Sequence, residues 1–170
     1  MQRYFKASAQ AKRMLDEQCE PGEILSFLTS AAEQASPGVV ASILYLDEKG
    51  LLRNCASPKL PQDYLQAIDG IKPDAQVGTC AAAAATGQIV ITEDFYSDSK
   101  WAELRHLPLA LGFRAAWSVP IKSSEGKVMG TFGMYFPTVR KPTSVEFEGL
   151  QVLAKAAAEI MERNEMVRTT

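Results

Sequence analysis

Seven side chains between residues 80 and 118 have the chemistry to bind or transform a small molecule. They are Cys80, Asp94, Trp101, Arg105, Arg114, Trp117 and Ser118. Cys80 begins a predicted helix, where the helix dipole can lower the pKa of a thiol and make it reactive. The alternative for Cys80 is burial at a tight helix–sheet contact, because cysteine is often a core residue. Each tryptophan can wall a pocket and offer one N–H donor, or can pack in the core.

The two arginines carry planar guanidinium groups that suit a carboxylate or phosphate of a ligand. Ion pairs with neighbouring carboxylates, Asp94 among them, are the alternative. Ser118 lies in "GFRAAWSVPI" (residues 112–121), a predicted strand in which one face is small and polar and carries one arginine. Successive side chains of a strand point to opposite faces. We therefore expect a ligand above the polar face, or, if the strand faces the other way, beside Trp117.

Catalytic and metal chemistry have little support in the residue inventory. The chain has one histidine, His106, and three widely separated cysteines, Cys19, Cys55 and Cys80. Zinc sites gather several histidines and cysteines, so we expect no metal site. No nucleophile elbow, phosphate loop or dinucleotide fingerprint occurs, and we expect no catalytic residue and no enzyme activity. His106 is expected at the surface or at a pocket edge.

Composition favours one soluble domain that binds neither nucleic acid nor membrane. The 170 residues are enough to bury a core, and the net charge is −2 with 18 lysines and arginines scattered along the chain. No basic stripe of the kind that tracks phosphates occurs. No apolar run reaches the roughly 18 residues of a membrane span, and the start lacks the apolar centre of a secretory signal. We expect a cytoplasmic protein.

The elements that position these side chains follow from residue periodicity. Helical composition or spacing predicts helices over residues 2–18, 21–35, 60–68, 80–86 and 99–107. Runs rich in β-formers predict strands over residues 39–46, 51–57, 88–92, 113–121 and 127–136. Because strands arrive in adjacent pairs, the order indicates an α+β sandwich. We expect a central antiparallel sheet with the terminal helices on one face and short helices and loops on the other.

The last predicted helix begins with "TSVE" (residues 143–146), which matches a capping box, and runs to about residue 168. Alternating steps of three and four residues form a heptad seam along it: Leu150, Leu153, Ala157, Ile160, Asn164 and Val167. Such a seam fits either packing on the domain or a dimer contact. We expect residues 1–20 to be an N-terminal helix and dimer element, and residues 21–168 to form one domain.

Several separated stretches, in the right order, resemble one family. They include "ASPKLPQDYLQAIDG" (56–70), "VGTCAAAAATGQIVITED" (77–94), residues 97–136 and "RKPTSVE" (140–146). They are similar to the GAF domain, most of all to the bacterial branch found in sensor histidine kinases and cyclic-di-nucleotide signalling proteins. The resemblance covers roughly residues 20–165. It implies a six-stranded antiparallel sheet, a small-molecule pocket on one face, and dimerisation through the terminal helices.

The resemblance does not name a ligand, but departures from it exclude some. The Cys-His pair that attaches a bilin in phytochrome-type relatives would fall at Glu103 and Leu104. The Asn-Lys-X-aromatic-Asp-Glu signature of cyclic-nucleotide-binding relatives is absent. Cys80 resembles a cysteine of the free methionine sulfoxide reductases, yet no cysteine follows it that could match their catalytic one.

The expected function is sensory. The chain is predicted to be a regulatory domain of a bacterial signal-transduction protein, such as a two-component system. It would bind an unidentified small molecule and signal through its terminal helices, as a homodimer, to a kinase or cyclase output domain. The sequence indicates no particular cofactor. Two alternatives stay open: a free-standing thiol-dependent enzyme resembling free methionine sulfoxide reductase, and a dimerisation scaffold whose vestigial pocket is filled.

Overall fold

The computed structural model describes residues 1–169, with side chains through residue 164. In chain order the elements are α1 (Gln2–Asp16), α2 (Pro21–Ala35), β1 (Val40–Leu46), β2 (Leu52–Ala56), α3 (Gln62–Ile68), α4 (Cys80–Thr86), β3 (Val90–Thr92), the 3₁₀ turn η1 (Ser99–Trp101), α5 (His106–Ala110), β4 (Ala115–Lys122), β5 (Val128–Phe136) and α6 (Ser144–Thr169).

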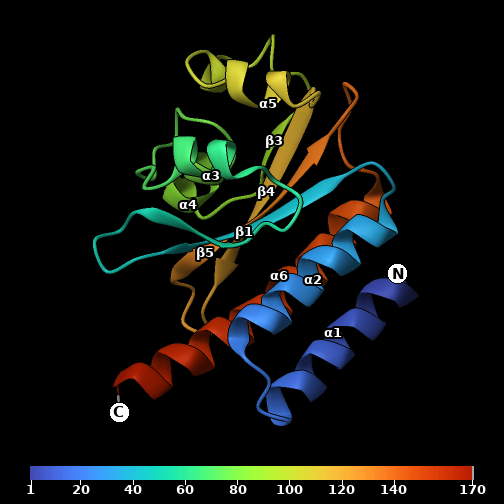
Figure 1. The fold of residues 1–170 in the computed structure, drawn as a ribbon, viewed down its shortest axis with the longest axis vertical. Coiled ribbons are helices and arrows are strands. Elements are labelled where there is room, and N and C mark those ends of the chain that lie inside the picture. The colour runs from blue at the N-terminus through green and yellow to red at the C-terminus, as the bar shows by residue number, and fades with distance from the viewer. Residues whose placement is uncertain (170) are drawn as a thin grey trace.

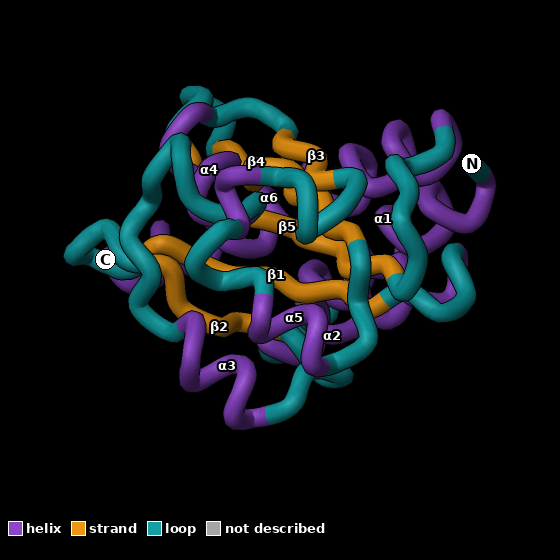
Figure 2. The backbone as a smooth tube through the Cα atoms, turned by 90° about the horizontal axis from the view of Figure 1, so that it is seen from above, coloured by secondary structure: helices purple, strands orange, loops and turns teal. Residues whose placement is uncertain are grey.

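The strands form one antiparallel sheet in the order β2-β1-β5-β4-β3. Helices α1, α2 and α6 lie on one side of this sheet, and α3, α4 and α5 lie on the other (Figure 1). In the view from above, the strands run through the middle of the molecule (Figure 2). The predicted α+β sandwich is therefore confirmed, with both layers placed as expected.

The sheet has five strands, so the prediction of a sixth strand is wrong. The residue pattern itself indicated five strands, and the sixth was implied only by the resemblance. After α3 the chain touches the sheet edge at a single isolated bridge between Leu52 and Ile71. Pro73 follows two residues later and has no N–H with which to continue a ladder. The segment therefore remains a loop.

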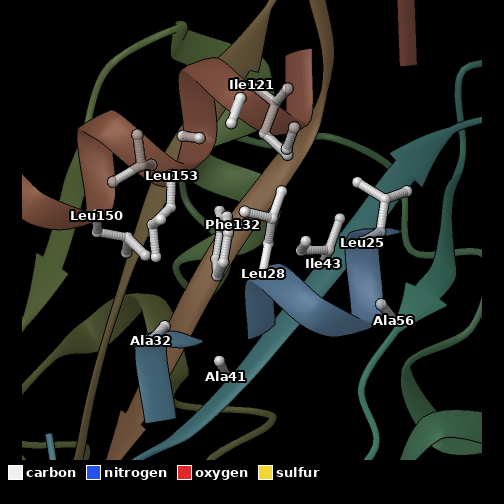
Figure 3. Packing of buried hydrophobic residues seen from close by; sticks show 14 of the residues in the cluster. Leu25, Leu28, Ala32, Ala41, Ile43, Ala56, Ile121, Phe132, Leu150 and Leu153 are labelled. Atoms are coloured by element: carbon white, nitrogen blue, oxygen red, sulfur yellow. The ribbon is translucent and has the colours of Figure 1, made fainter. Parts of the chain in front are cut away.

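The larger core lies between the sheet and the terminal helices. Figure 3 shows Phe132 of β5 and Ile43 of β1 beside Leu28 of α2, with Leu153 of α6 close to them. All four side chains are completely buried. Burial of each stabilises the fold by about 1.5–3 kcal/mol relative to exposure, which makes this layer the main source of stability.

The heptad seam of α6 faces this core. Leu150, Leu153, Ala157 and Ile160 are at most 1% exposed, so they pack on their own domain and do not offer a surface to a partner helix. Asn164 is half-buried, and the side chain of Val167 lies outside the described residues. The seam pattern thus reflects packing within the domain.

Several element boundaries lie where local sequence signals place them. In the capping box, the backbone N–H of Thr143 donates to Glu146 Oε1 (2.8 Å), and that of Glu146 donates to Thr143 Oγ1 (3.1 Å). Gly87 ends α4 in the left-handed region, with φ of 67°. Asp98 caps η1 by accepting a hydrogen bond from the N–H of Lys100 (3.0 Å).

Glu33 joins α2 to the sheet and gives the first testable prediction. Its Oε2 accepts a hydrogen bond from the backbone N–H of Ala41 (3.0 Å), and exposed Lys59 lies 3.9 Å from Oε1. Burial raises the pKa of Glu33, although the bond from Ala41 opposes this effect. Because the folded protein holds this proton more tightly than the unfolded chain, the contribution of Glu33 to stability is full at low pH. It falls as pH rises through the folded pKa.

We therefore expect Glu33→Gln, which keeps an acceptor for Ala41, to gain stability relative to wild type as pH rises from about 4 to about 7. Denaturant unfolding at both pH values measures the difference. Glu23→Gln is the control, because Glu23 is an exposed residue of the same helix. A stability difference for Glu33→Gln that does not change with pH contradicts the prediction.

Candidate ligand-binding site

A cavity of about 30 Å³ lies between the sheet and the middle helices. Its aliphatic wall is formed by Leu44, Leu52, Ile68, Ile71, Val77 and Leu104. Its polar wall is formed by Tyr64, Thr79, Cys80, Trp101 and Tyr135. The volume suffices for one or two water molecules, so opposite walls nearly meet. A larger ligand requires α3, α4 or the segment around Trp101 to move outward.

Larger hollows lie at the surface and have a different character. One of them, about 930 Å³, is the groove between α1 and α2, and exposed Arg3, Lys6 and Arg13 line it. The residues around the small cavity are instead buried or half-buried. A ligand in the small cavity would therefore be shielded from water, whereas a ligand in the surface groove would remain solvated.

The polar face of β4 meets the start of α4. Cys80 Sγ lies 3.1 Å from Ser118 Oγ, and Ser118 Oγ donates to Thr79 Oγ1 over 3.2 Å. Gly133 makes room for this contact, because a Cβ there would lie 3.1 Å from Ser118 Oγ and 3.3 Å from Cys80 Sγ. The alanines after Cys80 are buried and allow α4 to approach the sheet closely. The small, polar face of β4 therefore accommodates α4, and no β4 residue is among the described residues that line the cavity.

Burial controls the chemistry of Cys80. It raises the pKa of the Cys80 thiol above the ordinary value of 9.0, although the neighbouring hydroxyl groups of Ser118, Thr131 and Thr79 lower it in part. The thiol is therefore protonated at neutral pH, and the proximity of a helix start does not activate it. Cys19 and Cys55 pack against the core on the other side of the sheet.

A pair of tyrosines closes the cavity beside Cys80. Tyr64 Oη donates to Tyr135 Oη over 2.7 Å, and the rings meet edge to face with centroids 5.8 Å apart. Burial raises the pKa of both phenols. Sequence reasoning did not single out either residue. The available signal was strand alternation. Gly133 pairs with Ser118, and Tyr135 lies two residues after Gly133, so Tyr135 is on the same face of the sheet as Ser118.

Trp101 forms the outer wall of the cavity. It is 5% exposed, its ring lies against Phe95 with centroids 4.5 Å apart, and its Cε2 and Cζ2 atoms lie over Gly78. Gly78 has φ of 56°, a conformation that side chains other than glycine rarely adopt. Among the described residues, no acceptor lies within hydrogen-bond reach of Trp101 Nε1. The cavity wall thus contains one buried N–H donor without a partner in the protein.

Three of the predicted site residues that do not line the cavity surround the loop behind Trp101. The Arg114 guanidinium sits over the Tyr96 ring, 5.0 Å from its centroid, and 3.7 Å from Asp94. Arg105 Nη1 donates to the carbonyl oxygen of Tyr96 (2.9 Å). These contacts hold together the loop behind Trp101, so Asp94, Arg105 and Arg114 position the wall without lining it.

Trp117 lies on the opposite face of the sheet. It is completely buried and stacks on Phe147 of α6, with ring centroids 5.7 Å apart. Of the predicted site residues, Cys80 and Trp101 line the cavity, Ser118 contacts Cys80 without lining it, and Trp117 is separated from all three. His106 is exposed at the start of α5 and does not line the cavity.

Comparison with known proteins identifies the fold. The family model described as GAF domain matches residues 20–162. The chain belongs to the GAF domain family. A methyl sulfide methyltransferase-associated sensor from Methanosarcina acetivorans is 36% identical over 136 residues, which are 79% of this chain. The matched part is 14% of the length of that sensor, so this GAF domain corresponds to a small part of it.

Solved structures share the arrangement at low sequence identity. The GAF domain of a phosphoenolpyruvate-protein phosphotransferase from Coxiella burnetii has a TM-score of 0.80 at 13% identity and covers 99% of this chain and 98% of its own. A domain described as part of a two-component sensor histidine kinase protein from Sinorhizobium meliloti has a TM-score of 0.70 at 22% identity, over 87% and 96% of the two chains. These similarities concern the fold alone.

An enzyme with this fold is also among the similar structures. The free methionine-R-sulfoxide reductase from Neisseria meningitidis has a TM-score of 0.72 at 16% identity, over 96% of this chain and 91% of its own. In this GAF domain, the described residues contain no group of three histidine, cysteine or acidic side chains that could hold a metal ion. Over the same residues, no helix combines the length and apolar character needed to cross a bilayer.

Proposed function

We propose that this GAF domain is a sensory module that binds a small molecule in the cavity beneath Trp101 and signals through α1, α2 and α6. One observation carries the proposal: the cavity is walled jointly by the sheet, by α3, by α4 and by the segment around Trp101. Any ligand that fills it fixes the relative positions of these parts. A relative that is named as a sensor supports the same role.

A continuous set of contacts supports a route from the cavity to the terminal helices. Asp98, which caps the turn that carries Trp101, accepts a hydrogen bond from Thr92 of β3. In the next residue after β3, the carbonyl of Glu93 accepts from the N–H of Arg140 (3.1 Å). Arg140 pairs with Glu146 at the start of α6, and Ser36 at the end of α2 donates to Glu146 Oε2 (2.6 Å). Movement of the Trp101 wall can therefore reach both helices.

Signalling requires a ligand to bind one arrangement of these parts more tightly than another. We place the output contact on α1 and α6, where a homodimer and a kinase or cyclase domain would also be attached. Phe5 of α1 is 57% exposed beside the groove between these helices, which supports a contact surface there. A setting in a cytoplasmic bacterial two-component protein belongs to this proposal.

Two other functions are less well supported. A thiol-dependent reductase needs a reactive cysteine, and the raised pKa of buried Cys80 opposes that role. A dimerisation scaffold with a filled pocket is favoured by one observation, the small volume of the cavity. The sensor and scaffold interpretations differ in whether the cavity can open to admit a ligand.

A paired substitution tests the proposed function. Ala81 lines the cavity, and Ala85 is exposed on the same helix. We expect at least one compound in a thermal-shift screen of small metabolites, nucleotides and haem to raise the melting temperature of wild type. Ala81→Leu should abolish this increase by filling the cavity, at a cost of about 1–3 kcal/mol in stability, whereas Ala85→Leu should preserve it.

Two results would count against the sensor. One is a screen in which no compound stabilises the wild-type domain. The other is stabilisation that survives Ala81→Leu undiminished, which would place the ligand outside the cavity.

A further inference from the structure

We propose that the ligand of this cavity is an uncharged, mainly apolar small molecule with a hydrogen-bond acceptor, and that Trp101 Nε1 donates to that acceptor. The inference rests on the proposed function, since it assumes that the cavity beneath Trp101 is the binding site. It adds the chemical class of the ligand and the residue that recognises its polar atom.

The absence of charge follows from the cavity wall. None of the lining residues, all within the described part of the chain, carries a formal charge at neutral pH. Near the Trp101 segment, Arg105 and Arg114 are turned to the Tyr96 carbonyl and the Tyr96 ring. Lys100 pairs with Asp98. A carboxylate, phosphate or ammonium group in this site would lose its hydration without gaining an ionic partner, which costs several kcal/mol. Neutral ligands are therefore strongly favoured.

The apolar character follows from the six aliphatic residues of the wall, which supply most of the surface that a ligand would contact. The remaining polar groups are largely engaged with each other. Tyr64 donates to Tyr135, and Cys80 contacts Ser118, which donates to Thr79. The ligand therefore gains little by bringing several polar groups of its own.

Trp101 supplies a donor for the ligand. Trp101 Nε1 is buried and lacks a protein acceptor among the described residues. Trp101 itself lines the cavity, and Cε2, the atom to which Nε1 is bonded, lies over the cavity residue Gly78. A buried donor without a partner costs about 1–3 kcal/mol, and a ligand acceptor that satisfies it recovers part of this free energy. A carbonyl, ether or sulfoxide oxygen is a suitable acceptor.

Trp117 provides an internal reference. Its Nε1 also lacks an acceptor among the described residues, but its ring stacks on Phe147 on the far side of the sheet. The chain has only these two tryptophans, so the two indole N–H signals report on the cavity side and on the helix side separately.

Three probes of nearly equal shape test the proposal. Acetophenone is neutral and has a carbonyl acceptor, α-methylstyrene replaces that oxygen with CH₂, and benzoate replaces the methyl group with a charged oxygen. Each probe is titrated into ¹⁵N-labelled wild-type domain, and binding is followed through the indole N–H signals and the melting temperature. Trp101→Phe assigns the signals and retains an aromatic ring without the N–H.

We expect acetophenone to bind about fivefold more tightly than α-methylstyrene, as one neutral hydrogen bond allows. Acetophenone should shift the Trp101 indole proton downfield and leave the Trp117 signal in place. Benzoate should not bind detectably. In Trp101→Phe, acetophenone and α-methylstyrene should bind equally. If Trp101→Phe folds poorly, the indole N–H signals and probe affinities of the wild-type domain still test the proposal.

Two kinds of result overturn the inference and can be told apart. If α-methylstyrene or benzoate binds wild type as tightly as acetophenone, or the Trp101 signal does not respond, the ligand class is wrong while the cavity remains a binding site. If none of the three probes binds at its solubility limit, while a compound of the thermal-shift screen still stabilises wild type and Ala81→Leu abolishes that effect, the inference fails and the proposed function stands. If no compound of either set binds, both fail.

Discussion

Trp117→Ala is expected to lower the free energy of unfolding by about 3–5 kcal/mol. The side chain is completely buried, and its ring stacks on Phe147 of α6. Its removal leaves a large cavity at the contact between β4 and α6, and no new interaction offsets the lost packing. Because a domain of this size has about 5–15 kcal/mol of stability, the loss is a large part of the total. Denaturant unfolding monitored by circular dichroism measures it.

The control is Trp117→Phe, which retains most of the buried surface and is expected to cost much less. This variant should also bind acetophenone as wild type does, because Trp117 lies on the face of the sheet away from the cavity. A loss below about 1 kcal/mol for Trp117→Ala, the size typical of an average substitution, would contradict the assignment of Trp117 to the core.

Gly130→Ala is the second substitution with a large expected effect. Gly130 of β5 pairs with Tyr45 of β1, and a Cβ at this position would overlap the backbone carbonyl oxygen of Leu44. Backbone within a central pair of strands cannot move aside without breaking the ladder. We expect a loss of about 3 kcal/mol or more in the free energy of unfolding.

Gly133→Ala is the matched control on the same strand. Its Cβ would meet side-chain atoms, Ser118 Oγ at 3.1 Å and Cys80 Sγ at 3.3 Å, which can shift by a few tenths of an ångström. The loss of stability should therefore be clearly smaller, and α4 should be displaced slightly from the sheet. Equal losses for the two variants would show that the approach of Leu44 is not what requires glycine at residue 130.

Local features of the fold could be predicted from sequence because their causes lie within a few residues. The capping box joins Thr143 to Glu146, Asp98 caps the next turn through Lys100, and Gly87 ends α4 by its own backbone conformation. Strand alternation in "GFRAAWSVPI" likewise separated Trp117 from Ser118. In each case the interacting groups belong to one short segment, so the sequence of that segment is enough to predict the interaction.

The sixth strand shows where resemblance misled. The residue pattern supported five strands, and the family comparison implied one more. Whether the segment after α3 joins the sheet depends on the edge offered by β2 and on Pro73, which stops pairing after the single bridge between Leu52 and Ile71. A family resemblance cannot predict this outcome, because it depends on one proline of this particular sequence.

The candidate site was only partly predictable, since its members are far apart along the chain. Cys80, Trp101 and Ser118 were foreseen as candidates, whereas Tyr64 and Tyr135 were not, and the hydrogen bond between those tyrosines spans 71 residues. Asp94, Arg105 and Arg114 looked equally suited to a ligand, yet they hold the loop behind the cavity wall. Residue type alone cannot distinguish a side chain that lines a cavity from one that supports it.

The sequence by itself determined the α+β class, the GAF family and most helix ends, because periodicity, capping and turn residues act locally. Only the tertiary structure decided which face of β4 meets α4, that the α6 seam packs inward, and that Trp101 keeps an unpaired N–H beside an uncharged wall. These properties depend on which surfaces meet when the sheet and both helical layers pack, and close packing leaves a single arrangement.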